Sequence, residues 1–351
     1  IDVILDLVFN HSGESDRHGA TLSMRGLDNL TYYRHVEGRP GELINDTGCG
    51  NTIAGEHPVV RQLVLDSLRY FVRHAGVDGF RFDLATILGR ETDGFSAHAA
   101  LLSEICADPL LKDRVLIAEP WDIGPGGYQL GNFPAPFLEW NDRYRDDTRT
   151  FWRGDSQRLG SFVTAFAGSS DSFSRHGGDS TRTVNFLAAH DGFTLMDLVS
   201  HTVKHNEANG EDNRDGHNEN HSWNNGVEGA TTDGAVLSAR RADVKALLSS
   251  LFLSRGTVML TAGDEGGRSQ QGNNNAYCQD NAITWMHWDR LDEGLIEHTA
   301  MLAAIRKRFP ALGETTFLSG AGDVEWLTLA GSPMTVGDWE APFAGTLLAL
   351  L

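Results

Sequence analysis

The sequence predicts an α/β fold of parallel strands, of the (β/α)₈ TIM barrel type, and three observations support this. Short apolar runs alternate with amphipathic helical patterns along most of the 351 residues, as expected for repeated βα units. Nearly every apolar run ends in polar or charged side chains. These runs also recur at intervals of about one or two βα units. In such a barrel the C-terminal ends of all strands meet at one face, so these side chains would form one site.

The strand candidates are short runs rich in β-branched and aromatic residues, bounded by turn-forming residues. Five are well defined, and a weaker one (137–141) lies between the third and the fourth. In chain order the six runs cover residues 2–9, 79–85, 114–119, 137–141, 183–190 and 257–265.

Helices are expected between these runs, where apolar residues recur at helical spacing. The segments are 57–76, 242–256 and 295–312. Gly76 suits a C-terminal helix cap, and Pro310 stops the third helix.

The last part of the chain changes to a short strand-like pattern at 323–331. We therefore expect a partial catalytic barrel over residues 1–312 and the start of a small C-terminal β domain over residues 313–351.

Composition limits the partners. The formal net charge of −19 disfavours nucleic acid and anionic membrane surfaces, because an acidic surface repels phosphate. The three cysteines form no CxxC motif, so neither a zinc knuckle nor a disulfide framework is indicated, and a cytoplasmic location is expected. No signal peptide or transmembrane run is visible. Because the chain both begins and ends inside an apolar run, we expect it to be a segment of a longer protein.

One segment, residues 204–229, is rich in Asn, Gly, Asp and His and poor in apolar residues. A loop of this length in a compact domain is usually functional or disordered. It fails the EF-hand pattern, because counting from Glu211 places Ser222 where the bidentate glutamate should be. No metal site is predicted.

The polar residues at the strand ends are the candidate site. They are Asp6, Asn10, His11, Arg81, Asp83, Glu119, Trp121, His190, Asp191, Asp264 and Glu265. We leave the last two as ordinary strand-end or capping groups.

Strand alternation places Arg81 and Asp83 on one face, with Phe80, Phe82 and Leu84 on the other. An adjacent guanidinium lowers the pKa of a carboxyl, which suits an anionic nucleophile.

Glu119 follows an aliphatic run and precedes Pro120 and Trp121, so partial burial would raise its pKa towards that of a general acid. Two carboxyls with opposite environments are typical of glycoside cleavage, and in retaining enzymes they lie about 5–5.5 Å apart.

Other interpretations remain open. Asp6 and Asn10 could bind loop backbone, Arg81 and Asp83 could form a structural ion pair, and Trp121 could belong to the core. A metal-dependent hydrolase is a second class, although Arg81 beside the key carboxylate would repel a metal. A non-catalytic glycan-binding relative is a third. The order and spacing of the residues favour the catalytic interpretation.

Four motifs, "DLVFNH", "GFRFDLA", "IAEPW" and "AAHD", resemble in order the signature regions of the α-amylase superfamily of glycoside hydrolases. Three more, "AEPWDIGPGGYQLGNF", "KHNEANGEDNRDG" and "AGDEGGRSQQGNNNAYCQDN", are similar to bacterial glycogen debranching enzymes of the isoamylase type. The resemblance covers nearly the whole chain.

The resemblance implies a role for each matching residue. Asp83 would be the nucleophile, Glu119 the general acid/base and Asp191 the third carboxylate, which binds sugar hydroxyls. Arg81 would hold the nucleophile. The residues implied to bind sugar are His11, Trp121 and His190, and those implied to support the site are Asp6 and Asn10.

The resemblance also implies the reaction, which is retaining hydrolysis of α-1,6 branch linkages in glycogen or limit dextrin without a cofactor. Relatives that act on α-1,4 linkages share the four main motifs and remain an alternative. The match begins near the third barrel strand of the family, so an incomplete barrel is expected. An open sheet exposes its edges, and we expect the 351-residue chain alone to be poorly stable or inactive.

Overall fold

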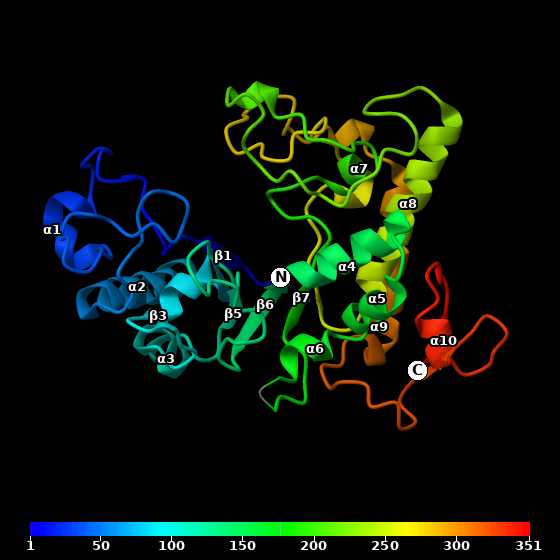
Figure 1. Ribbon diagram of the computed structural model, residues 1–351, viewed down its shortest axis with the longest axis horizontal. Coiled ribbons are helices and arrows are strands. Elements are labelled where there is room, and N and C mark those ends of the chain that lie inside the picture. The colour runs from blue at the N-terminus through cyan, green and yellow to red at the C-terminus, as the bar shows by residue number, and fades with distance from the viewer. Residues whose placement is uncertain (176) are drawn as a thin grey trace. The chain divides into compact units, whose positions relative to one another are not determined.

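The computed structural model describes residues 1–175 and 177–351. Contacts divide the chain into two compact units, Ile1–Trp140 and Asn141–Leu351 (Figure 1). The expected domain boundary near residue 312 differs from this boundary after Trp140, and the expected domains stay a prediction.

Each of the six expected strand regions contains a strand. The strands are β1 (Ile4–Leu7), β2 (Gly79–Phe82), β5 (Val115–Ala118), β6 (Phe137–Asn141), β7 (Thr183–Asn185) and β8 (Thr257–Val258). In the first unit, β1, β2, β5 and β6 pair in parallel in that order. In the second, β7 pairs in parallel with β8. The α/β fold with parallel strands is confirmed, whereas the (β/α)₈ barrel stays a prediction.

The first unit contains three α-helices. They are α1 (Met24–Tyr32), α2 (Pro58–Tyr70) and α3 (Ala100–Ala107). α2 continues as a π-helical turn at Phe71–Ala75, and Gly76 ends it with φ +67° as expected. The 3₁₀ turn Ala85–Gly89 precedes a short antiparallel pair, β3 (Arg90–Glu91) with β4 (Gly94–Phe95).

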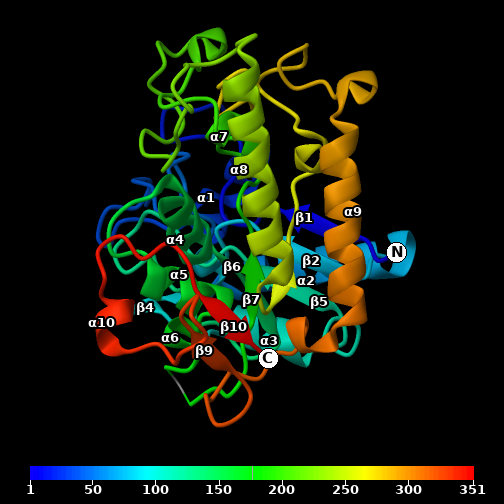
Figure 2. The same ribbon diagram turned by 90° about the vertical axis from the view of Figure 1, so that its right-hand side faces the viewer.

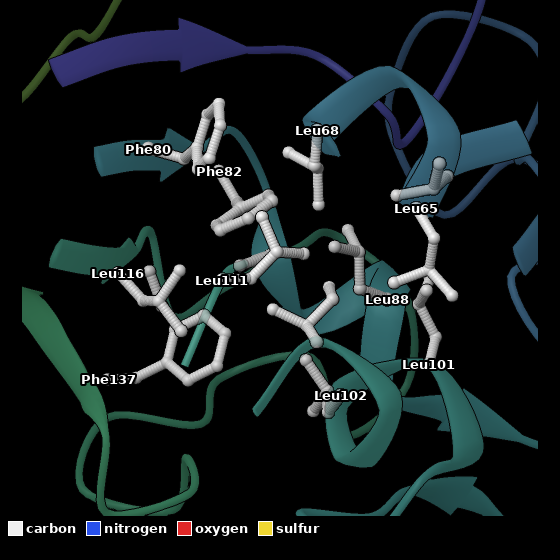
Figure 3. Packing of buried hydrophobic residues seen from close by; sticks show 14 of the residues in the cluster. Leu65, Leu68, Phe80, Phe82, Leu88, Leu101, Leu102, Leu111, Leu116 and Phe137 are labelled. Atoms are coloured by element: carbon white, nitrogen blue, oxygen red, sulfur yellow. The ribbon is translucent and has the colours of Figure 1, made fainter. Parts of the chain in front are cut away.

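The core of the first unit lies between its strands and helices (Figure 3). Phe80 and Phe82 of β2 are fully buried, and they face leucines of α2 and α3. Those leucines are Leu65, Leu68, Leu101 and Leu102. Burying one such side chain stabilises the fold by about 1.5–3 kcal/mol. This packing fixes β2, so the alternate residue, Arg81, must point to the opposite face.

The second unit is mainly helical. Its α-helices are α4 (Asp142–Arg153), α5 (Leu159–Phe166), α6 (Ser170–Phe173), α7 (Leu195–Leu198), α8 (Gly234–Leu253), α9 (Glu293–Arg308) and α10 (Val336–Trp339). The long helices α8 and α9 lie side by side (Figure 2). Both contribute leucines to one core, Leu247 and Leu251 from α8 and Leu295 and Leu302 from α9.

Shorter elements complete the second unit. 3₁₀ turns cover Glu207–Asn209, Asp264–Gly266, Trp288–Arg290 and Pro310–Leu312. Near the C-terminus, β9 (Glu325–Leu327) pairs antiparallel with β10 (Leu348–Leu350). Among residues 1–175 and 177–351, no helix is long and apolar enough to cross a membrane.

Five of the six expected strands are longer than the observed ones, and for three of them the structure gives a local reason. β2 ends at Phe82 because Leu84 takes a left-handed conformation, with φ +39° and ψ +51°, so Leu84 does not continue the strand face assigned to it. β7 ends at Asn185 rather than at residue 190. Beyond it, Arg149 Nε donates to the Leu187 carbonyl at 3.1 Å, where a neighbouring strand would otherwise bind. β8 ends before a turn closed by Asp264 N donating to Thr261 O at 3.1 Å.

The Asn-rich segment 204–229 is built around buried amides. Asn206 is fully buried and exchanges two bonds with Asn274. Its Nδ2 donates to Asn274 Oδ1 at 2.8 Å, and its Oδ1 accepts from Asn274 N at 2.9 Å. Asn274 Nδ2 in turn donates to the His217 carbonyl at 2.8 Å. Since buried amides replace an apolar core here, the unusual composition has a structural cause.

Candidate active site

Arg81 is the centre of a carboxylate cluster in the first unit. Its side chain is only 5% exposed and binds three acids. Nη1 donates to Asp6 Oδ1 at 2.7 Å and to Asp83 Oδ1 at 2.8 Å, while Nη2 donates to Glu119 Oε2 at 2.7 Å. The strand register explains the contact with Asp6, since Asp6 of β1 lies opposite Arg81 of β2. One guanidinium therefore aligns three carboxyls from three chain segments.

Asp83 is held as an anion. Burial tends to raise its pKa, but bonds from Asn10 and Arg81 outweigh burial and keep the pKa below its usual value. Asn10 Nδ2 donates to Asp83 Oδ2 at 2.9 Å and to the Asp83 carbonyl at 2.8 Å. The carboxylate is therefore both ionised and fixed in orientation.

Glu119 holds its proton. Burial is the main cause, and with the negative charge of Asp83 it raises the pKa to about 8 against the opposing charge of Arg81. Oε2 accepts from Arg81 and from the backbone N–H of Leu84 at 2.8 Å, so Oε1 is the oxygen placed to carry the proton. The left-handed backbone of Leu84, uncommon for a residue with a Cβ, directs that N–H towards Glu119.

Asn10 connects Asp83 to His11. It is fully buried, and its Oδ1 accepts from His11 Nδ1 at 2.5 Å. Burial lowers the pKa of His11 and the charge of Asp83 partly offsets this effect. The imidazole is therefore neutral near pH 7, with hydrogen on Nδ1 and an acceptor at Nε2. Asn10 was expected only to support the site, and in the structure it makes two direct hydrogen bonds to Asp83.

Trp140 was not among the predicted site residues. It lies on β6, and the Arg81 guanidinium carbon sits 4.1 Å from the centroid of its ring, a cation–π contact that holds the guanidinium flat. The signal in the sequence was a tryptophan inside the weakest strand candidate, one position before its end. Trp121, by contrast, is half-buried two residues after Glu119.

The remaining predicted residues lie in the second unit. His190 and Asp191 are exposed, in the turn that follows β7. Asp191 lines a small polar cleft that also includes Arg145, Arg149 and Asn220. Of the predicted residues, Asp6, Asn10, His11, Arg81, Asp83 and Glu119 come together in the first unit.

Asp264 and Glu265 lie outside the Arg81 cluster, and we continue to treat them as structural groups. They lie in a 3₁₀ turn, where buried Asp264 accepts from the backbone N–H of Leu195 at 3.0 Å. Burial raises the pKa of Asp264 to about 7.

The Arg81 cluster suits acid–nucleophile chemistry better than metal binding, because a fixed cation already occupies the point where the carboxyls converge. An ionised aspartate beside a protonated glutamate is the combination used by retaining glycosidases.

The chain is similar in sequence to bacterial glycogen debranching enzymes. It is 55% identical over 341 residues to the glycogen debranching enzyme of Pectobacterium atrosepticum, covering 97% of this chain and 51% of that protein. It is 52% identical over 347 residues to the glycogen operon protein GlgX homolog of Haemophilus influenzae, covering 97% and 52%. The resemblance seen in the motifs is thus confirmed, and the chain spans about half the length of these curated relatives. No family model matches the chain.

Solved pullulanase structures share the fold. The pullulanase of Anoxybacillus sp. LM18-11 complexed with maltotriose aligns with a TM-score of 0.67 and 26% identity, covering 90% of this chain and 41% of that one. The type I pullulanase of Bacillus subtilis complexed with maltose aligns with a TM-score of 0.69 at 24% identity, covering 93% and 43%.

Proposed function

We propose that this chain carries the catalytic residues of a retaining glycoside hydrolase that cleaves α-1,6 branch linkages in glycogen or limit dextrin. The observation that carries the proposal is the pair of carboxyls on Arg81, since the pKa of Asp83 is lowered and that of Glu119 is raised to about 8. At pH 7 one is a nucleophile and the other an acid.

In the first step, an Asp83 carboxylate oxygen attacks the anomeric carbon. Glu119 gives its proton to the glycosidic oxygen as the bond to that oxygen breaks, so the branch leaves as an alcohol and a glycosyl ester forms on Asp83. In the second step the ionised Glu119 takes a proton from water, the water oxygen displaces Asp83, and both carboxyls return to their first state. Two inversions give retention.

Further residues take supporting roles in this proposal. Neutral His11 offers Nε2 to a sugar hydroxyl, and His190 is a second sugar-binding histidine. Asp191 is the third carboxylate, which binds hydroxyls of the distorted sugar, and Trp121 offers a ring on which a glucose can stack. Asp6 and Arg81 keep the carboxyls aligned.

The linkage and the setting rest on the relatives. Glycogen debranching enzymes match this chain across 97% of its length, and a pullulanase of the same fold binds maltotriose. We accordingly propose an incomplete (β/α)₈ barrel, a branched α-glucan as substrate and a cytoplasmic protein of glycogen degradation.

The test uses the protein extended to the length of its relatives. Phosphorylase-limit dextrin and linear maltooligosaccharides are supplied at equal glucose content, and products are resolved by chain length. Release of linear chains from the branched substrate alone supports debranching. Preferential cleavage of the linear substrate would assign the protein to the α-1,4-acting relatives instead.

A further inference from the structure

Three potential metal ligands meet in the second unit, at the two ends of the Asn-rich segment. They are His201, His205 and Glu228, and one ligand atom of each lies within 4.8 Å of those of the other two. His201 Nδ1 lies 3.5 Å from Glu228 Oε1, and His205 Nε2 lies 3.1 Å from the same oxygen. Two imidazoles and a carboxylate form a set that suits zinc better than calcium or magnesium, which prefer oxygen.

The separations fit tetrahedral coordination. Zinc–nitrogen and zinc–oxygen bonds of about 2.0–2.2 Å place neighbouring ligand atoms about 3.3–3.5 Å apart. Of the two histidine–glutamate separations, 3.5 Å is at the upper limit of that range and 3.1 Å is slightly below it. His205 is the more exposed imidazole, with 37% of its side chain accessible, so its ring can turn to complete the third edge.

His201 supplies an independent observation. The residue is 7% exposed, and its Nδ1 is buried without a hydrogen-bond partner in the part of the chain that the structure describes. Leaving such a ring nitrogen unmatched is unfavourable. Nδ1 points to Glu228, while Nε2 faces Asp197 Oδ1 at 3.8 Å. A carboxylate behind the second nitrogen is the usual outer partner of a zinc-bound histidine.

Two glycines, Gly229 and Gly272, pack closely against the imidazole rings of His201 and His205. A Cβ on Gly272 would lie 2.8 Å from His201 Nδ1 and 2.9 Å from His205 Cδ2. A Cβ on Gly229 would lie 3.3 Å from His201 Cε1. The Gly272 carbonyl also accepts from His205 N at 2.8 Å. These glycines let the chain hold both imidazoles in place.

Glu228 is fixed from the other side. Its Oε2 accepts from the backbone N–H of Thr202 at 2.9 Å, the hydroxyl of Thr202 at 2.8 Å and Asn224 Nδ2 at 3.0 Å. Oε1 accepts a longer bond from the same Thr202 N–H at 3.1 Å, and it is the oxygen towards which both histidines point. Such bonds to a ligating carboxylate are the outer contacts that orient a metal ligand.

We propose that His201 Nδ1, His205 Nε2 and Glu228 bind one Zn²⁺, with water in the fourth position. The ion ties residues 201–205 to residue 228 and so closes the Asn-rich segment at its base. None of the three ligands is a proposed glycosidase residue, so the zinc proposal can be tested independently of the proposed function.

The test measures Zn²⁺ binding to tag-free, chelator-treated protein at full length, by calorimetry with a competing chelator. The ligand variants are His201→Gln and His205→Gln. The matched control is His221→Asn. His221 belongs to the same segment and lies 3.3 Å from Glu219 and 4.0 Å from Asp146, but among the described residues these groups do not form a cluster whose ligand atoms all lie within 4.8 Å of one another. We expect one Zn²⁺ per chain, an affinity loss of about 100-fold or more in each ligand variant, and a change under about threefold in the control.

Two further readouts keep the test decisive. Circular dichroism without metal checks that each variant folds. Co²⁺ added to the unmodified protein reports coordination directly, because tetrahedral cobalt bound to nitrogen gives strong visible absorption, so this readout needs no variant. Absence of that spectrum, or equal Zn²⁺ affinity in the unmodified protein and both ligand variants, would overturn the proposal and leave a structural His205–Glu228 hydrogen bond.

Discussion

Two buried arginines in the first unit bind carboxylates in different ways. Arg81 shares its guanidinium among three acids, Asp6, Asp83 and Glu119. Arg90 instead makes a bidentate pair with the fully buried carboxylate of Asp122, through bonds of 2.7 Å from Nε and 2.6 Å from Nη2. A second acid, Asp46, lies 3.6 Å from Arg90 Nε and is shared with Arg34. The single guanidinium of Arg81 contacts more carboxylates than its one charge can balance, whereas each carboxylate oxygen of Asp122 has its own nitrogen donor on Arg90.

The difference between the two arginines indicates which buried acid stays protonated at neutral pH. Around Arg81, one cation cannot neutralise three carboxyls. Asp6 is exposed, Asp83 is partly buried and Glu119 is the most buried of the three, so Glu119 keeps a proton with a pKa of about 8. Around Arg90 the pair is matched, and its geometry serves to hold the loop that carries Asp122. An excess of acid over base therefore marks the reactive cluster, and a matched pair marks the structural one.

The largest contrast is expected from removing one acid in each cluster. Asp83→Asn should lower kcat by about 10⁴-fold or more, since no nucleophile remains, while the free energy of unfolding is kept because a crowded negative charge is lost. Asp122→Asn should lower the free energy of unfolding by about 3–5 kcal/mol, because buried Arg90 loses its bidentate partner and keeps only the longer contact with Asp46 at 3.6 Å. Rates on limit dextrin and urea unfolding measure both. Equal loss of activity per folded molecule in the two variants would erase the contrast.

Removing the stored proton is the next test. Glu119→Gln should lower kcat on limit dextrin by about 10²–10⁴-fold. The loss in glycosyl–enzyme formation should be far smaller with a glucosyl fluoride, whose leaving group needs no acid. A variant that is equally slow with both leaving groups would show that Glu119 is not the acid.

The same variant changes the pH dependence of stability. The folded pKa of Glu119, about 8, lies above the usual 4.5, so its contribution is fully present below pH 4.5 and is lost as the pH rises to about 8. The free energy of unfolding of Glu119→Gln, relative to the unmodified protein, should therefore increase between pH 5 and 9. Urea midpoints across that range measure the difference, and a constant difference would contradict the raised pKa.

The two arginines can be compared by the same substitution. Arg81→Lys should lower kcat/KM by about 100-fold, because a single ammonium cannot align three carboxyls. Arg90→Lys breaks a bidentate pair and should mainly lower the melting temperature. Activity is normalised to folded protein in both cases. A larger activity loss in Arg90→Lys than in Arg81→Lys would reverse our assignment of the two clusters.

The smallest effect is expected at Asn10. Asn10→Ala removes two bonds to Asp83, so the pKa of Asp83 rises and the acid limb of the kcat/KM profile moves to higher pH, with a loss of about tenfold at pH 7. Asn10 also orients His11, and His11→Ala is the matched comparison. It should lower the rate without moving the acid limb, and an identical shift in both variants would remove Asn10 from the control of Asp83.

The Arg81 half of this contrast could be predicted from the sequence, because strand alternation places Arg81 and Asp83 on one face, whereas the Arg90–Asp122 pair was not predicted. The apolar runs also located the six parallel strands β1, β2, β5, β6, β7 and β8, and β6 was predicted at its observed bounds. Alternation does not reveal which side chain from another strand lies beneath, so Trp140 of β6 under Arg81 of β2 was missed. Nor does it reveal a left-handed Leu84, whose N–H binds Glu119 across 35 residues.

Strand ends were also beyond the sequence pattern. The run that continues β7 is apolar and buried, but its carbonyls are bound by side chains from elsewhere in the second unit, such as Arg149 at the Leu187 carbonyl. An apolar pattern indicates burial, whereas the partner of each backbone group depends on tertiary structure.

The central claim is that Asp83 is the nucleophile and Glu119 the acid/base. Glu119→Gln in the full-length protein, supplied with a maltosyl fluoride, should form the glycosyl ester without an acid but should fail to activate water for its hydrolysis. Proteolysis and mass spectrometry should then find one maltosyl group on the peptide that contains Asp83. A label on another carboxylate, or no label together with release of inverted sugar, would contradict the account.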